Sequence, residues 1–600
     1  MSVCDIPADV EIFTDCEDVR LAALWRSMPE SAARLDPFST WWWARASCGL
    51  GMAPQPYVVV LRRGASPIAI ASFALGDTRR GKRLTCCARM HRDLFDMMAV
   101  EDSAATAEAI CAAIPWHEIH EVRLDGIPAD SPLGPALYSW AQRNGLRGAF
   151  YCNNGAPEMS LLDKQGKRFA DYKAIMRSRY SKDLRRHMAK LGNVRYVKAN
   201  HREQVATLIE ALSWLHQKRW CTTPFPSYFA DKESGRLPFR IAEEAFDAGA
   251  LHLSAVFVDQ RAVAAGMGYV VGATFCFHCV AHDNDFAKYS PGRTLMSYLL
   301  DDLLADGRVN RFSYLAGEEG YKLLHASGTR PLCRLDMTRS CSRALIVSLG
   351  ASFEQAARRR PRLLAALRGI KRFLLWHRYG IRCRMRRLCG PRSRGGISST
   401  SAGLLGGQPS PIFYERRRFQ IMCLPALEET GAADGPEVRA GTLDDFNRLT
   451  ESRLGWRDPV IIGQFFERMR QGLRFYVACA EGKPVGGIWI GLEASALPPA
   501  FSAGATAAFS PAGTAFIVDG WVEPRAREVR AHAAFLRKVT ARLREEKACQ
   551  RLLAAIDARD RQAVRAHEET GFRLVQEVSL TRILGRTIVR AKGGISVAQI

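Results

Sequence analysis

The sequence lacks features that would place the chain in several specialised classes. Its 17 cysteines among 600 residues are too few for a disulfide scaffold. Cys276 and Cys279 would face opposite sides of a strand, and no second pair lies at zinc-ligand spacing. No basic and apolar leader precedes Asp5, and no apolar run approaches the ~18 residues that cross a bilayer. We therefore expect a cytoplasmic protein with reduced thiols and no metal, and attachment to the inner-membrane surface stays open.

Acidic residues are scarce relative to basic ones, with 61 Asp and Glu against 85 Lys and Arg and a formal net charge of +24. This excess favours anionic partners, which include nucleic acid, acidic lipid headgroups and phosphorylated small molecules. Hydrophobic residues make up 47% of the chain, a fraction typical of globular proteins. Because single cores rarely exceed about 250–300 residues, the length predicts several domains.

Alternating helical and strand-like segments predict α/β (α+β) domains over residues 1–155, 156–340 and 412–600. In the second domain, three apolar strands lead into a polar loop and a helix. The strands are predicted over 251–258, 263–271 and 274–282, and the helix over 293–305. In the first domain, the three consecutive tryptophans from Trp41 are typical of aromatic packing beside a sheet, with ligand stacking as the alternative.

The loop between the last of these strands and the helix is the strongest candidate for a binding site. A loop that enters a helix presents backbone N–H groups and the positive end of the helix dipole to an anion. We hypothesise that this anion is the pyrophosphate of acetyl-CoA or another acyl-CoA. The residues predicted to bind it are Tyr289, Ser290, Gly292, Arg293 and Thr294.

Residues 341–411 have a different composition. Between Arg358 and Arg394 there are 13 Arg, one Lys and no acidic residue. Apolar residues at helical spacing, such as Leu363, Leu367 and Ile370, predict a basic amphipathic helix that binds an anionic membrane surface. A helix that packs on its own domain is an equal alternative. Residues 395–411 read as a flexible linker.

Residues about 10–340 resemble the bacterial family of acetyltransferases involved in cellulose biosynthesis, which is related to the Fem-type peptidyltransferases. The resemblance rests on Tyr289-Ser290-Pro291-Gly292, on Gly317 to Lys322, and on the basic stretch Arg177 to Lys190. It implies two halves with acetyltransferase folds, of which the second holds the acyl donor. Such folds have mixed, mostly antiparallel sheets flanked by helices.

Residues about 412–585 resemble the Gcn5-related N-acetyltransferase superfamily, through Trp521 to Arg525 and Asp560 to Phe572. The stretch at the position of the family's pyrophosphate loop, Arg527 to His532, has neither of the usual glycines. Arg527 and Arg530 are the donor-binding candidates that remain. His567 occupies the position of the family's tyrosine acid. This domain therefore reads as a divergent copy.

Acyl transfer from a thioester needs a base for the acceptor's proton and an acid for the leaving thiolate. Asp283 and His282 lie where the strand meets the loop and are the candidate bases. The resemblance implies that Tyr321 is the acid. Four further residues are candidates for substrate binding: Arg185, Arg186, Glu318 and Lys322.

The sequence therefore predicts an acyl-CoA-dependent N- or O-acetyltransferase in cell-envelope or exopolysaccharide biosynthesis, acting on a small-molecule or glycan-precursor acceptor. One alternative is a Fem-like transferase that uses aminoacyl-tRNA, and only in that case do we expect a nucleic-acid partner. The other alternative is a non-catalytic membrane-associated scaffold or regulator with degenerate acetyltransferase domains.

Overall fold

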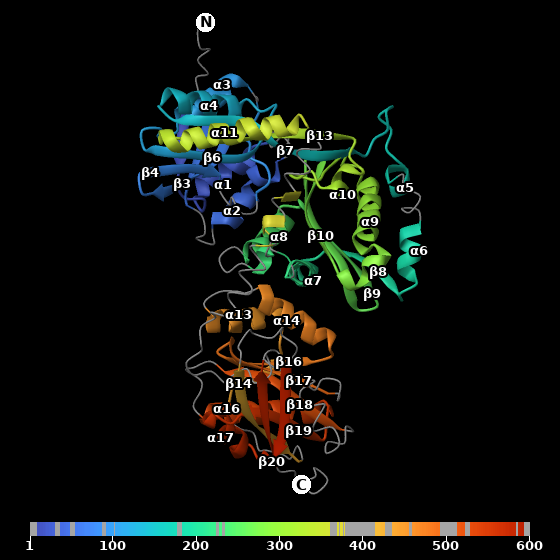
Figure 1. The fold of residues 1–600 in the computed structure, drawn as a ribbon. Helices are drawn as coiled ribbons and strands as arrows, with labels where there is room; N and C mark the ends of the chain where they lie inside the picture. The colour runs from blue at the N-terminus through green and yellow to red at the C-terminus, as the bar shows by residue number, and fades with distance from the viewer. Residues whose placement is uncertain are drawn as a thin grey trace. The chain divides into compact units, whose positions relative to one another are not determined.

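The structure, a computed structural model, describes most of the chain. The described residues are 9–29, 36–48, 54–86, 92–100, 103–176, 183–221, 223, 227–230, 235–360, 369–370, 373–375, 377, 414–425, 435–454, 459–492, 513–522, 529–583 and 586–592. They form two compact units, one of Met1–Arg219 with Ser227–Arg372 and one of Trp220–Pro226 with Phe373–Ile600. Each unit is built on one large sheet, of thirteen strands in the first and eight in the second (Figure 1).

The N-terminal half of the first unit is a strand meander followed by a parallel pair. Its strands are β1 (Asp9–Phe13), β2 (Gln55–Arg63), β3 (Ser66–Thr78), β4 (Gly81–Cys86), β5 (Met98–Ala99) and β6 (Ile119–Pro128). Its helices are α1 (Val19–Ser27), α2 (Trp41–Cys48), α3 (Ala104–Ala112) and α4 (Leu133–Arg143). β1 to β4 pair antiparallel, and β4 pairs parallel with β6. The crossover from β4 to β6 carries α3, as a parallel connection requires.

The second half repeats this order. Its strands are β8 (Val194–Lys198), β9 (Leu251–Val258), β10 (Arg261–Val271), β11 (Thr274–His282) and β12 (Arg311–Ser313). Its main helices are α6 (Leu184–Ala189), α7 (Arg202–Trp220), α8 (Leu237–Asp247), α9 (Pro291–Asp306) and α10 (Gly320–Leu323). The predicted meander before the loop is confirmed: β9, β10 and β11 pair antiparallel.

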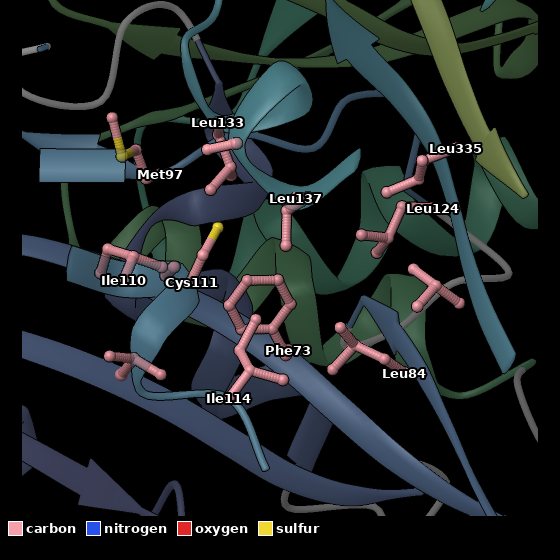
Figure 2. Close-up of a cluster of buried hydrophobic side chains, with 14 of the residues drawn as sticks. Phe73, Leu84, Met97, Ile110, Cys111, Ile114, Leu124, Leu133, Leu137 and Leu335 are labelled. Carbon is pink, nitrogen blue, oxygen red and sulfur yellow. The ribbon is translucent and has the colours of Figure 1, made fainter. Parts of the chain in front are cut away.

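Two strands join the halves into one sheet. β13 (Gly328–Thr338), from the end of the unit, lies between β6 and β7 (Arg147–Ser160), and β7 lies between β13 and β12. Leu335 of β13 packs into the core of the N-terminal half, beside Leu124 (Figure 2). The predicted boundary at residue 155 thus falls inside β7, so neither half completes its sheet alone.

Aromatic packing also connects the halves. Trp42 and Trp43 of α2 are buried and contact Tyr269 of β10, with ring centroids 5.0 and 5.9 Å apart. The tryptophans therefore belong to the hydrophobic core, as their clustering predicts.

The second unit has the strand order of the second half. Its strands are β14 (Tyr414–Leu424), β15 (Glu437–Ala440), β16 (Arg474–Ala480), β17 (Lys483–Gly491), β18 (Thr514–Val522), β19 (Arg551–Asp557), β20 (Arg573–Ile583) and β21 (Arg586–Lys592). Its helices include α13 (Leu443–Leu454), α14 (Pro459–Arg470), α16 (Val529–Glu545) and α17 (Arg561–Glu569). The order β15-β16-β17-β18-β19-β14-β20 matches β8-β9-β10-β11-β12-β7-β13, including the single parallel pair. The prediction of repeated, mixed, mostly antiparallel sheets flanked by helices is confirmed.

The segment after β13 begins with a helix that the sequence reading did not single out, α11 (Cys341–Arg358), which crosses the first unit's sheet (Figure 1). Of the basic stretch 358–394, only 358–360, 369–370, 373–375 and 377 are described. Within the described part of the chain, we find no helix both long and apolar enough to span a bilayer.

Candidate active site

The parallel strands β11 and β12 diverge soon after they pair. Their register runs from Thr274 opposite Arg311 to Cys276 opposite Ser313. β11 then continues to His282, whereas the chain after β12 follows β7: Tyr314 N donates to Pro157 O at 2.9 Å. Among the described strands none pairs with β11 on this side beyond Cys276. This strand edge inside a sheet has backbone groups that can bind an extended ligand.

The edge leads to the first turn of α9. A short 3₁₀ helix (Asn284–Tyr289) follows β11, Ser290 adopts a left-handed conformation with φ of 54°, and Pro291 starts α9. Ser290 and Pro291 set the direction of the chain, since proline suits the first position of a helix. A Cβ atom at Gly292 would have a single neighbouring side chain within 4 Å, the His282 imidazole, whose Nδ1 atom would be 3.3 Å away. The side of the turn next to Gly292 is therefore open to an anion.

The other residues predicted to bind the pyrophosphate have different positions. Arg293 is half-buried and close enough to His325 to contribute to lowering the pKa of that imidazole, although desolvation is the larger cause. Thr294 is fully buried, and its hydroxyl donates to Ser290 O at 3.3 Å. Tyr289 packs against a hydrophobic cluster that includes Leu295. Gly292 and Arg293 thus fit a phosphate site better than Thr294 does.

Asp283, a candidate base, is fully buried in an ion-pair network. One carboxylate oxygen accepts from Lys218 Nζ at 2.6 Å and the other from an Arg261 guanidinium nitrogen at 2.5 Å. The Asp285 backbone N–H donates to the first oxygen at 3.1 Å, which caps the 3₁₀ helix. Both oxygens already bind cations, and this arrangement fixes the end of β11.

His282, the other candidate base, is half-buried beside Gly292. Desolvation, with a smaller contribution from Arg219, lowers the pKa of its imidazole to about 4. The ring is therefore neutral at neutral pH, and it can donate or accept a hydrogen bond at the start of α9.

The predicted residues around α10 divide into buried and exposed ones. Lys322 is buried, and its Nζ donates to Ala316 O at 2.7 Å and pairs with Glu319 at 3.1 Å. Glu318 pairs with Arg358 at 3.3 Å. Tyr321 is 51% exposed, and desolvation, followed by Glu319, raises the pKa of its phenol to about 12. Lys322 and Glu318 thus hold the turn that presents Tyr321 as a protonated phenol.

Asp93, which the sequence reading missed, lies in the same region. Its carboxyl is an electrostatic neighbour of Tyr321, Lys322 and Cys279 of β11. The pKa of Asp93 is raised to about 6, chiefly by desolvation; Lys322 opposes this shift and Glu319 adds to it. Only the tertiary structure shows this proximity, because the sequence offers no more than a charged pair, Arg92-Asp93, before a mostly apolar segment that Asp96 interrupts.

The loop that carries Asp93 is anchored from the N-terminal half. The Arg92 side chain is 1% exposed and pairs with buried Asp36 at 3.3 Å. Arg92 also donates to Ser39 Oγ at 3.0 Å and to Leu94 O at 2.6 Å. These bonds fix the backbone on either side of Asp93.

The two arginines predicted to bind the acceptor differ in their surroundings. Arg185 packs α6 against α9, since it pairs with Asp301 at 2.6 Å, donates to Ser297 O at 2.8 Å and lies over the Tyr298 ring. Arg186 is 76% exposed and pairs with Asp183 at 3.4 Å. Of the two, only Arg186 has a largely exposed guanidinium.

The second unit contains the same diverging strands, because the parallel β18–β19 register ends at Ile517 opposite Ala554. Arg527 lies outside the described residues, and Arg530 is in the first turn of α16 with its side chain undescribed. His567 is buried and packs against His532 and Phe572, with centroid separations of 5.5 and 4.9 Å. Burial is the main cause that lowers the pKa of His567 to about 3. Its imidazole is thus part of the α16–α17 core.

The cysteines of β11 do not form a metal site with other ligands of the described residues. Cys276 and Cys279 are both buried in β11. Across the described ranges, no three or more His, Cys, Asp or Glu side chains converge as a metal site requires.

Comparison with known proteins gives one family match, in the second half of the first unit. Residues 176–323, about a quarter of the 600-residue chain, match the family model described as Acetyltransferase (GNAT) domain. No curated protein matches the chain. Similar solved structures include FemX, with 9% identity and a TM-score of 0.37 over 53% of this chain and 96% of that one.

Two further solved structures are similar at the same level. The C-terminal domain of a putative lysylphosphatidylglycerol synthetase from Agrobacterium fabrum has 13% identity and a TM-score of 0.34, covering 55% of this chain and 96% of that one. A tandem GNAT protein from the clavulanic acid biosynthesis pathway has 12% identity and a TM-score of 0.30, covering 55% and 98%. These scores are too low to transfer any property of those proteins. The matched residues include β11, α9 and α10, so the chain carries a GNAT-type acetyltransferase domain over residues 176–323.

Proposed function

We propose that the first unit transfers an acyl group, in the first place acetyl, from acyl-CoA to an amine or hydroxyl acceptor in cell-envelope or exopolysaccharide biosynthesis. The observation that carries the proposal is the free edge of β11, which runs directly to the open first turn of α9. An extended pantetheine arm matches such an edge, and its pyrophosphate matches the helix N-terminus. The GNAT match over the same residues supports this assignment.

The site has two ends. Gly292, Arg293 and His282 lie at the phosphate end. Cys279 lies three residues before His282 on β11, which corresponds to about 10 Å along a strand. Cys279 is an electrostatic neighbour of Asp93 and Tyr321. The reacting thioester therefore belongs near Asp93 and Tyr321.

We assign the chemistry to these two residues. The amine nitrogen or hydroxyl oxygen of the acceptor attacks the thioester carbonyl, and Asp93 accepts the proton that this atom loses. Backbone N–H groups of the β11 edge stabilise the oxyanion. As the carbon–sulfur bond breaks, the Tyr321 phenol donates a proton to the thiolate.

Asp93 suits the role of base better than the two residues predicted from sequence. A base works best when its pKa lies near the operating pH, and the pKa of Asp93 is about 6 against about 4 for His282. Asp283 already binds two cations through its two oxygens. We assign His282 to hydrogen bonding at the phosphate end and Asp283 to fixing the end of β11.

Calorimetry with acetyl-CoA and the full chain tests the proposal. Gly292→Val places methyl groups where the phosphate would approach, so we expect the affinity to fall by about tenfold or more. Gly328→Val is the matched control, because a Cβ there meets nothing within 4 Å. Absence of acetyl-CoA binding by the unmodified chain would overturn the proposal and leave the scaffold and aminoacyl-tRNA alternatives.

The aminoacyl-tRNA alternative is compatible with the net charge of +24, because Lys and Arg side chains bind the phosphates of a nucleic acid. RNase treatment separates the two donors, since it abolishes activity only if tRNA supplies the acyl group. Mass spectrometry of envelope precursors that accumulate in a deletion strain identifies the acceptor.

A further inference from the structure

α11 presents its large apolar side chains to solvent. Leu345, Leu349 and Phe353 recur every four residues along one stripe, and Ile346 lies beside them. The exposed fractions are 62% for Leu345, 62% for Leu349, 58% for Phe353 and 70% for Ile346. Monomeric surfaces commonly expose single apolar residues, whereas a continuous stripe marks an interaction surface.

The opposite face of α11 packs on the sheet with small residues. The buried positions are Ala344, Ala351 and Ala357. Arg343 pairs with Glu121 of β6, and Arg358 pairs with Glu318, so these charges also lie on the protein side. A surface helix normally buries its large apolar residues and exposes its charges. α11 has the reverse arrangement.

The outer face of α11 contains one partly exposed charge before its end, Glu354, whose side chain is 36% exposed and lies 4.0 Å from Arg358. The exposed residues from Cys341 to Ala356 are Cys341, Ser342, Leu345, Ile346, Leu349, Gly350, Ser352, Phe353, Gln355 and Ala356. Exposed Arg359 and Arg360 follow at once. Past them, Ile370, Phe373 and Leu374 are 56, 66 and 59% exposed. These residues belong to the stretch from Arg358 to Arg394, with 13 Arg, one Lys and no acid.

We propose that the outer face of α11 is a membrane-docking surface that inserts Leu345, Leu349 and Phe353 into an anionic bilayer. Arg359 and Arg360 bind the phosphate headgroups, as in other interfacial amphipathic helices, and the basic composition of the sequence up to Arg394 favours the same acidic surface. Charge complementarity selects this partner. A bilayer of acidic lipid offers an apolar interior beneath a negative surface, whereas a second copy of this chain would bring an equally basic stretch.

Sedimentation with vesicles tests the surface in the full-length protein. We expect binding to vesicles of equal parts phosphatidylcholine and phosphatidylglycerol, and much weaker binding to phosphatidylcholine alone. The triple variant Leu345→Ser, Leu349→Ser, Phe353→Ser should lower the partition coefficient on the mixed vesicles about 100-fold, because each side chain loses its apolar contact with the acyl region. Deleting residues 359–394, which keeps Arg358 and its pair with Glu318, should remove the dependence on acidic lipid and on salt.

The matched control is Val19→Ser, which removes an 80% exposed apolar side chain from α1 and should leave vesicle binding unchanged. Circular dichroism and acetyl-CoA affinity report whether the variants stay folded. Vesicle binding by the triple variant equal to that of the unmodified protein would overturn the proposal. The proposal would also be overturned if light scattering showed that the triple variant no longer forms dimers while it still binds vesicles. The stripe would then be the contact with a second copy of the chain.

Discussion

Replacing Asp283 by Asn should loosen the start of α9 without removing the group that performs the chemistry. Asp283 is fully buried between Lys218 at 2.6 Å and Arg261 at 2.5 Å. Breaking a buried ion pair by removing one partner costs about 3–5 kcal/mol. The expected cost here is lower, about 2–3 kcal/mol, because Arg261 is 49% exposed and Lys218 keeps Asp285 at 2.7 Å.

Asp285→Asn is the matched control for this substitution. Asp285 pairs with the same two cations, but its side chain is 40% exposed, so we expect a loss below about 1 kcal/mol. The difference of about 2 kcal/mol corresponds to about 30-fold in a local opening equilibrium. Hydrogen-exchange mass spectrometry of peptides from β11 to α9 measures it, because amide exchange reports local opening free energies.

Measuring kcat of the Asp283→Asn variant gives the result that could refute this structural role of Asp283. If Asp283 only fixes the end of β11, the folded Asp283→Asn protein keeps a kcat close to that of the unmodified chain. Unchanged exchange together with a kcat lowered about 100-fold or more, at unchanged acyl-CoA affinity, would identify Asp283 as the base. The assignment of Asp93 would then fall as well.

Two further predictions concern titration. In the unmodified protein, kcat/KM should fall as the pH drops through about 6, because Asp93 must be ionised to accept a proton. Asp93→Asn should lower kcat by about 100-fold or more and abolish this acid limb of the plot of kcat/KM against pH. A limb that persists in Asp93→Asn would contradict its role as base. In the second unit, desolvation is the main cause that lowers the pKa of His532 to about 4 and that of His567 to about 3, from an ordinary value of 6.5. Both imidazoles are therefore neutral in the folded protein, and below about pH 6.5 they gain protons when the protein unfolds. Their contribution to stability is complete above 6.5 and is lost as pH falls toward the folded values, by about 2–4 kcal/mol between about pH 7 and about pH 5. Hydrogen exchange of α16 and α17 peptides should show this loss, and His567→Leu should reduce it by about half; an unchanged pH dependence in that variant would rule out His567 as its source.

Local patterns were sufficient where an element depends on its own residues. The runs of apolar residues at 251–258 and 274–282 predicted β9 and β11 with the bounds that the structure shows, because these strands are buried on both faces. The spacing of Leu295, Leu299 and Leu303 predicted α9 for a comparable reason, since one helical face packs on the sheet. The local pattern did not identify β7 and β13, whose partners lie in the opposite half of the unit.

Strand β11 and the turn before α9 follow from the sequence by itself, whereas the free edge of β11 exists because β12 leaves it to pair with β7. An apolar strand, a loop with Gly292 and a periodic helix are the pattern from which the anion site was predicted. The tertiary structure decided which side chains face that site. It placed Asp283 between two cations, used Arg185 to pack α6 on α9, and brought Asp93 from the N-terminal half to Tyr321. The physical reason is that pairing and desolvation depend on neighbours distant in the chain, and only the shared sheet brings these neighbours together.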